Sequence, residues 1–161
     1  IEVTGPEIPI LDGSAAQFVE GFLLAGIRRL NTPLRVIEVQ KFVSVTVGEA
    51  KARLDPADTL LIRFEIDFAD SAIGHQEKTL NMSNGAFVRE LCNSRTFCRS
   101  SDVDAMRAQG LALGGTLENA VVVDGENVLS PGGLRYKDEA VRHKMLDALG
   151  DLYTAGAPIL G

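Results

Sequence analysis

The chain has 161 residues, of which 45% are hydrophobic and 24% are charged, and its formal net charge is −6. This length and apolar content suffice for one ordinary domain or two small ones. The negative charge argues against a general nucleic-acid binder and against a protein that binds anionic membranes. No apolar run approaches the roughly 20 residues that a transmembrane segment requires. Cys92 and Cys98 have neither a C-x-x-C nor a zinc-finger spacing, so we interpret them as free thiols in a reducing compartment and expect a cytoplasmic protein.

The first predicted elements are the end of a strand at residues 1–3 and a helix over residues 14–30. Asp12 or Ser14 can cap this helix, because a short oxygen-bearing side chain accepts hydrogen bonds from the free N–H groups of the first turn. Apolar residues repeat at helical spacing and predict a broad apolar face. Pro33 then disfavours helical conformation in the residue before it, so we expect a domain boundary near residue 32.

A series of strands is predicted after the boundary. The clearest lies in "LLIRFEIDF", where Ile62 and Ile66 face one way while Arg63 and Glu65 face the other. A sheet with one buried and one polar face is typically antiparallel. The predicted strands span residues 35–39, 41–47, 49–54, 60–68 and 77–82.

The remaining pattern predicts two short helices, a strand–turn–strand unit and a final helix. These elements cover residues 83–95, 100–110, 118–129 and 138–156. Their order predicts an α+β fold: a two-layer sandwich with a mostly antiparallel sheet, helices on one face and an inserted helix–strand unit. A doubly wound fold is not expected, because the glycines of "GLALGGT" do not form G-x-G-x-x-G.

The final helix carries the first candidate site. At about 100° per residue, His143, Lys144, Asp147 and Asp151 share one quadrant. An imidazole and a carboxylate one turn apart can both reach one zinc ion, and a second carboxylate one turn further can orient a neighbouring group. The alternative is a solvated polar face, which spacing alone favours. No third ligand is evident, since the only other histidine, His75, is expected in a polar loop.

Two further stretches carry candidate sites. Thr96 is expected after a helix end, where its hydroxyl can donate to a developing oxyanion, and Phe97 can form one wall of a ligand site. A capping threonine and a core phenylalanine are the alternatives, and the residues alone favour them. Residues 102–123 are rich in aliphatic side chains that can enclose an acyl chain, although packing on the main sheet is the simpler interpretation.

Several stretches together resemble UDP-3-O-acyl-N-acetylglucosamine deacetylase, a zinc amidase of bacterial lipid A synthesis. They are "GPEIPILDGSAAQFV", "SRTF", "GLALGGTLENAVVVD", "GLRYKDEAVRHKMLDALGDL" and the "IDF" strand. The resemblance implies two similar α+β domains. Residues 1–32 are then expected to end the first domain, and residues 33–161 to form a C-terminally truncated second domain with an acyl-tunnel insert at about 98–127.

The resemblance also implies roles for individual residues. His143 and Asp147 are the implied Zn2+ ligands, while the third protein ligand, the general base and a further catalytic histidine are expected outside this chain. Thr96 is implied to stabilise the oxyanion and Asp151 to orient that histidine. The implied substrate-binding residues are Phe97 at the sugar, Lys144 near the nucleotide-sugar head, and Val103, Ala112, Gly115 and Leu117 in the acyl tunnel.

The implied activity is zinc-dependent hydrolysis of the N-acetyl group of UDP-3-O-(3-hydroxyacyl)-N-acetylglucosamine, an early committed step of lipid A biosynthesis in Gram-negative bacteria. The implied partner is this acylated UDP-sugar, and the implied enzyme is a monomer. The chain by itself is expected to be inactive, because part of the site is expected elsewhere. The alternative is a non-catalytic structural or nucleotide-sugar-binding fragment. Ala112 stands where some family members carry Cys, which changes the expected tunnel width.

Overall fold

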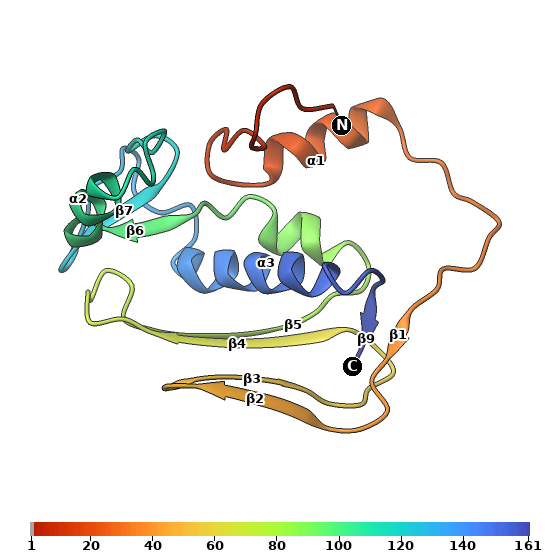
Figure 1. Ribbon diagram of the computed structural model, residues 1–161. Coiled ribbons are helices and arrows are strands. Elements are labelled where there is room, and N and C mark those ends of the chain that lie inside the picture. Colours follow the sequence, from red (N-terminus) through yellow and green to blue (C-terminus); the bar gives the residue numbers. More distant parts are fainter. Residues whose placement is uncertain (1) are drawn as a thin grey trace.

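The computed structural model describes residues 2–161, apart from the side chain of Asp104. It is an α+β fold in which strand hairpins form one layer and helices lie over one face of it (Figure 1). This confirms the predicted fold class. The elements are α1 (Ala16–Ala25), β1 (Ile37–Glu38), β2 (Val43–Val47), β3 (Ala50–Leu54), β4 (Leu61–Asp67), β5 (His75–Asn81), the π-helix η1 (Phe87–Leu91), β6 (Phe97–Arg99), α2 (Ser100–Ala108), β7 (Val121–Asp124), β8 (Asn127–Val128), α3 (Glu139–Tyr153) and β9 (Ile159–Leu160).

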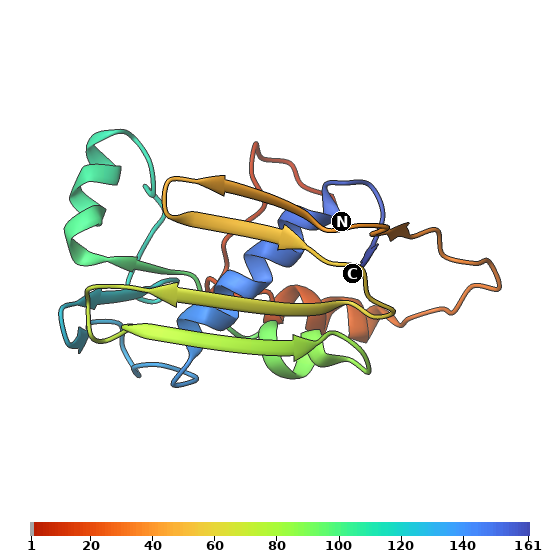
Figure 2. The same ribbon diagram turned by 90° about the horizontal axis from the view of Figure 1, so that it is seen from below.

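Two antiparallel hairpins make up the strand layer. β2 pairs with β3, and β4 pairs with β5 over seven residues from Leu61↔Asn81 to Asp67↔His75. Viewed from below, the four strands run side by side, with α3 crossing behind them (Figure 2). The alternation predicted for β4 is confirmed, because Ile62 and Ile66 are buried while Arg63 and Glu65 are exposed.

The core lies between this strand layer and α3. Val141 and Met145 of α3 are completely buried, and they belong to clusters that include Ile66 and Ile62 of β4 respectively. Burial of one such side chain contributes about 1.5–3 kcal/mol. The apolar stripe of α3 therefore fixes the helix on the hairpin and sets which of its other side chains face the surrounding loops.

The inserted unit is a strand–helix–strand arrangement. β6 and β7 pair in parallel, with Phe97 opposite Val121, and α2 lies between them in the sequence. Asp70, in the turn between β4 and β5, accepts hydrogen bonds from Arg99 Nε at 2.6 Å and from the N–H of Gly125 at 3.0 Å. These bonds attach the inserted unit to the end of the β4–β5 hairpin.

The short helix predicted over residues 83–95 is present only in part. Phe87–Leu91 form a π-helix, and its end is marked by a hydrogen bond from the N–H of Cys92 to the carbonyl of Phe87. Asn84 and Gly85 both have positive φ angles, which α-helices of L-residues do not accommodate, and they prevent an earlier start.

The first helix is shorter than predicted. Its N-cap is Ala15, but the Ser14 hydroxyl accepts from the N–H of Ala16 at 3.3 Å, as predicted for a capping side chain. The helix ends at Gly26, whose φ of 90° leaves the helical region. The expected strand at residues 1–3 is absent at residues 2–3, and Ile1 lies outside the described residues. The loop predicted around His75 is also wrong, because His75 begins β5 opposite Asp67.

A large part of the apolar surface of α1 and the β2–β3 hairpin is exposed. α1 has no buried residue, and Leu24 is 81% exposed. β2 exposes Val43, Val45 and Val47 along one edge of the strand layer. Apolar patches of this kind mark contact surfaces or aggregation sites. Over residues 2–161, no helix has both the length and the hydropathy needed to cross a membrane.

Candidate metal centre on the last helix

α3 brings His143 and Asp147 together, one turn apart. His143 Nε2 lies 3.3 Å from Asp147 Oδ1, and Lys144 Nζ lies 2.8 Å from Asp147 Oδ2. The shared face that their spacing predicts is therefore present. Asp151 follows one turn further along the same helix and is exposed. Their roles toward metal and substrate stay predictions.

His143 is more buried than a solvated helix face implies. It is only 9% exposed, and its Nδ1 lies 2.9 Å from the carbonyl oxygen of Ser94. A carbonyl can only accept, so a neutral ring carries its hydrogen on Nδ1 and a lone pair on Nε2. That lone pair and the Asp147 carboxylate are two acceptors 3.3 Å apart. Both atoms can therefore donate a lone pair to one cation placed between them.

A buried ion pair holds the segment that contacts His143. Arg95 and Glu139 are 6% and 1% exposed, and Arg95 donates to Glu139 from its Nε at 2.9 Å and its Nη2 at 3.1 Å. Burial alone would raise the pKa of Glu139. The hydrogen bonds from the Arg95 side chain and from the backbone N–H groups of Arg95 and Arg135 outweigh this and hold its pKa below the ordinary value. Glu139 is therefore an ionised carboxylate.

Thr96 lies immediately before β6, between two segments distant in sequence. Its N–H donates to the carbonyl of Gly13 at 2.8 Å, and its carbonyl accepts from the N–H of Val121 at 2.8 Å. Phe97 packs on the core, with its ring edge-to-face on Phe68 at a centroid distance of 5.4 Å. These contacts fit a core phenylalanine, and a substrate contact by Phe97 stays a prediction.

The loop before α1 is tied to the loop before α3. Asp12 pairs with Arg135 Nη2 at 2.7 Å, and Arg135 Nη1 also donates to the side chain of Asn93 at 2.9 Å. These bonds hold Gly13 where its carbonyl can accept from Thr96. Gly13 has a φ of 83°, and a side chain there would overlap the carbonyl oxygen of Asn119.

Gly13→Ala is expected to destabilise the protein by about 3 kcal/mol or more, because backbone strain adds to a collision with backbone. Gly48→Ala is the matched control. Gly48 also has a positive φ, of 58°, but nothing lies within 4 Å of the added carbon, so this change reports strain alone, about 1 kcal/mol. Urea unfolding of both variants measures the difference. Equal losses of unfolding free energy in the two variants would show that the backbone around Gly13 moves to accommodate the added carbon without further destabilisation.

The predicted acyl-tunnel residues lie on α2 and in the loop that follows it. Val103 of α2 and Gly115 are half-buried, whereas Ala112 and Leu117 are exposed. Ala112 has a φ of 52°, an uncommon conformation for a residue with a side chain. Leu113, between these positions, is 75% exposed. The segment thus presents aliphatic side chains away from the core, and their contact with an acyl chain stays a prediction.

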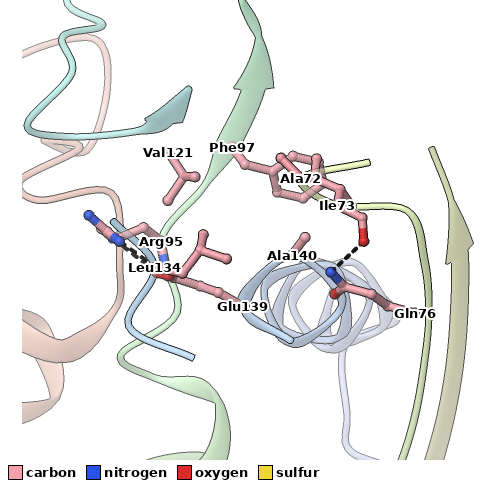
Figure 3. A pocket seen from close by; sticks show the side chains of 9 residues that line it. All are labelled: Ala72, Ile73, Gln76, Arg95, Phe97, Val121, Leu134, Glu139 and Ala140. Atoms are coloured by element: carbon pink, nitrogen blue, oxygen red, sulfur yellow. Dashed lines mark hydrogen bonds and ion pairs between the residues drawn. The ribbon is translucent and has the colours of Figure 1, made fainter. Parts of the chain in front are cut away.

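A small cavity of about 10 Å³ lies between β6, β7 and the start of α3. It holds about one water molecule and cannot hold a substrate. Figure 3 shows the Arg95–Glu139 pair on one side of it and Gln76, whose amide donates to the carbonyl of Ile73, on the other. The remaining lining residues are Ala72, Phe97, Val121, Leu134 and Ala140.

The sequence interpretation overlooked Arg95 and Glu139. Glu139 stands four residues before His143, so helical periodicity places the two on one face and was the available signal. For Arg95 the sequence contains no comparable signal, because its partner lies 44 residues away. Within the described part of the chain, no group of three His, Cys, Asp or Glu side chains is arranged to hold a metal ion.

The sequence profile described as UDP-3-O-acyl N-acetylglycosamine deacetylase matches residues 1–161. The chain belongs to this deacetylase family. Curated relatives from several bacteria carry the name UDP-3-O-acyl-N-acetylglucosamine deacetylase. The one from Phenylobacterium zucineum (strain HLK1) is 50% identical over 161 residues, and those from Anaeromyxobacter sp. (strain Fw109-5) and Haemophilus influenzae (strain 86-028NP) are 47% and 46% identical.

Each alignment with these deacetylases covers 100% of this chain but only 55%, 53% and 53% of the respective relative. The chain therefore spans about half the length of the curated relatives it matches. The resemblance stated from its motifs is confirmed at the level of the family.

Proposed function

We propose that this chain supplies two zinc ligands and part of the substrate site of a UDP-3-O-acyl-N-acetylglucosamine deacetylase. The observation that carries the proposal is the pair of acceptors on α3, His143 Nε2 and Asp147 Oδ1, 3.3 Å apart. The names of the family and of the relatives support the deacetylase part of this proposal. The third ligand and the general base are proposed to lie outside the chain.

The donor set fits zinc. Neutral imidazole nitrogen and carboxylate oxygen are common zinc donors, and the Ser94 carbonyl selects the tautomer that leaves Nε2 free. Zinc bound there would lower the pKa of a bound water and polarise the acetamide carbonyl. Three residues of this chain would act beside the metal. The hydroxyl of Thr96 would donate to the oxyanion, and Asp151 would orient a histidine from outside the chain. Lys144 would attract the diphosphate of the substrate.

The acyl chain would lie along the segment after α2. Val103, Gly115 and Leu117 would contact it, together with Ala112, and Phe97 would pack near the sugar. The exposure of aliphatic side chains in this segment supports the assignment, because each methylene of an acyl chain buried against them contributes about 0.8 kcal/mol.

Ala112→Leu is expected to lower kcat/KM for long acyl chains more than for short ones, because the larger side chain shortens the apolar path. Ala112→Gly is the control, since it relieves the positive φ without filling space and is expected to leave the chain-length profile unchanged. Both are measured in a full-length deacetylase that carries this chain. An equal loss for all acyl lengths in Ala112→Leu would show that position 112 does not line the path.

The proposed function is tested by acetate release from UDP-3-O-(3-hydroxyacyl)-N-acetylglucosamine with the same full-length deacetylase. Activity should disappear on treatment with a chelator and return on addition of zinc. Binding of the UDP-sugar without acetate release would instead support the non-catalytic alternative. We place the reaction in the cytoplasm, which the free thiols of Cys92 and Cys98 support, and we propose a monomeric enzyme.

A further inference from the structure

One peptide group, joining Ser94 to Arg95, is held at both ends by side chains of α3. Its N–H, from Arg95, donates to Glu139 Oε1 at 3.0 Å, and its carbonyl oxygen, from Ser94, lies 2.9 Å from His143 Nδ1. The N–H and C=O of a trans peptide point in opposite directions. Glu139 and His143 are four residues apart on the helix, a rise of about 6 Å. The peptide group therefore spans the gap between two side chains on the same face of the helix.

The charge at the Glu139 end of this arrangement strengthens the bond at the other end. Glu139 is almost completely buried, and its oxygens also accept from the N–H of Arg135 at 2.6 Å and from the Arg95 guanidinium. A charged acceptor on the N–H polarises the peptide group, which makes its carbonyl oxygen a stronger acceptor. The Ser94 carbonyl then favours a hydrogen on Nδ1 of His143 over one on Nε2.

We propose that Glu139 is a positioning residue that acts through the 94–95 peptide group to hold His143 in the tautomer with hydrogen on Nδ1. This leaves the Nε2 lone pair beside Asp147. Metal-binding histidines commonly donate their second N–H to a carboxylate or a carbonyl. Here the carbonyl is itself held by a carboxylate. The consequence for metal affinity rests on the proposed function, whereas the tautomer is a property of the metal-free protein.

The neighbouring Asp138 provides a matched control. It is also an ionised carboxylate at the start of α3: burial alone would raise its pKa, but Arg142 and Lys78 outweigh this and lower it. Asp138 pairs with Lys78 at 2.8 Å and with Arg142 at 2.7 Å. Asp138→Asn therefore weakens ion pairs at the same end of the helix without changing the acceptor on the 94–95 peptide group.

The experiment compares Glu139→Gln and Asp138→Asn with the wild type in a full-length deacetylase that carries this chain. Long-range ¹H–¹⁵N spectra of the metal-free proteins, recorded with the imidazoles neutral, report the tautomer of His143, and exposed His75 is the internal reference. Hydrogen on Nδ1 is expected in the wild type and in Asp138→Asn, and a mixture of tautomers in Glu139→Gln. Zinc affinity, measured by chelator competition, should fall about tenfold or more in Glu139→Gln alone.

Three results would overturn or separate the proposals. If His143 of the wild type carries its hydrogen on Nε2, the positioning role of Glu139 is overturned. If Glu139→Gln does not fold, this measurement on the wild type is sufficient to test the proposal. A Glu139→Gln protein that is less stable but keeps the wild-type tautomer and zinc affinity shows that the buried ion pair is only structural. A wild type with hydrogen on Nδ1 but no zinc binding supports the positioning role and refutes the proposed metal site.

Discussion

Replacement of His143 by glutamine is expected to remove bound zinc and deacetylase activity together from a full-length deacetylase that carries this chain. Nε2 of His143 faces Asp147 Oδ1 at 3.3 Å, and the glutamine amide cannot supply an imidazole lone pair there. Metal ions supply several kcal/mol of transition-state stabilisation, so kcat/KM should fall about 1000-fold or more. Zinc content by mass spectrometry and acetate release are measured on the same preparation.

His75→Gln is the control for this replacement. His75 is the other histidine of the chain and lies on β5, with its nearest carboxylate, from Glu65, 3.9 Å away. Its side chain is 56% exposed, so its replacement should leave zinc content and kcat/KM nearly unchanged. Stoichiometric zinc in the His143→Gln variant would show that His143 is not a zinc ligand.

Arg95→Met is expected to lower the free energy of unfolding by about 3–5 kcal/mol at pH 7, because it leaves the Glu139 carboxylate buried without its cation. Arg63→Met is the matched control. Arg63 also pairs with a glutamate, Glu77, at 2.8 Å, but the two side chains are 63% and 43% exposed. An exposed pair contributes at most about 1 kcal/mol. Urea unfolding at pH 7 should therefore separate the two variants clearly.

The effect of Arg95→Met should shrink as the pH falls. In the wild type the folded-state pKa of Glu139 is below the ordinary value of 4.5, so its contribution to stability is present above about pH 4.5 and is lost as the pH falls through the folded-state pKa. In Arg95→Met the pKa of the buried Glu139 carboxyl is expected to lie above its wild-type value, because the side-chain hydrogen bonds of Arg95 are lost, so protonation in acid should reduce the destabilisation of the variant. The same unfolding measurement at pH 4 tests this. An unchanged difference would show that Glu139 is not the source of the loss.

The parts of the fold that were predicted correctly depend on local patterns. The alternation of β4 and the apolar stripe of α3 follow from the neighbours of each residue, since a strand repeats every two residues and a helix every 3.6. β6 has only three residues, too few to show a period, and it exists because it pairs with β7. η1 was predicted as an ordinary helix, because a π-helix differs in its hydrogen bonds rather than in its residue types.

The candidate site also contains features that local sequence patterns predict and features that they do not. The spacing of His143 and Asp147 is local, so the sequence alone predicts their shared face. The partner of His143 Nδ1 is a backbone carbonyl 49 residues away, and every residue type has such a carbonyl. Sequence patterns therefore cannot reveal which nitrogen of the His143 ring carries the hydrogen. They also cannot reveal that Arg95 and Glu139 are buried.

The bond between Asp12 and Arg135 constrains the order in which the chain can fold. These residues are 123 positions apart, whereas Arg95 and Glu139 are 44 apart. Loop-closure entropy makes the longer closure about 0.9 kcal/mol less favourable. The hairpins and the Arg95–Glu139 pair are thus expected to form first, and the Asp12 loop to dock last. The backbone of Thr96 receives its hydrogen bond with Gly13 only in that final step, so the segment that carries the proposed oxyanion donor would be the last to become aligned.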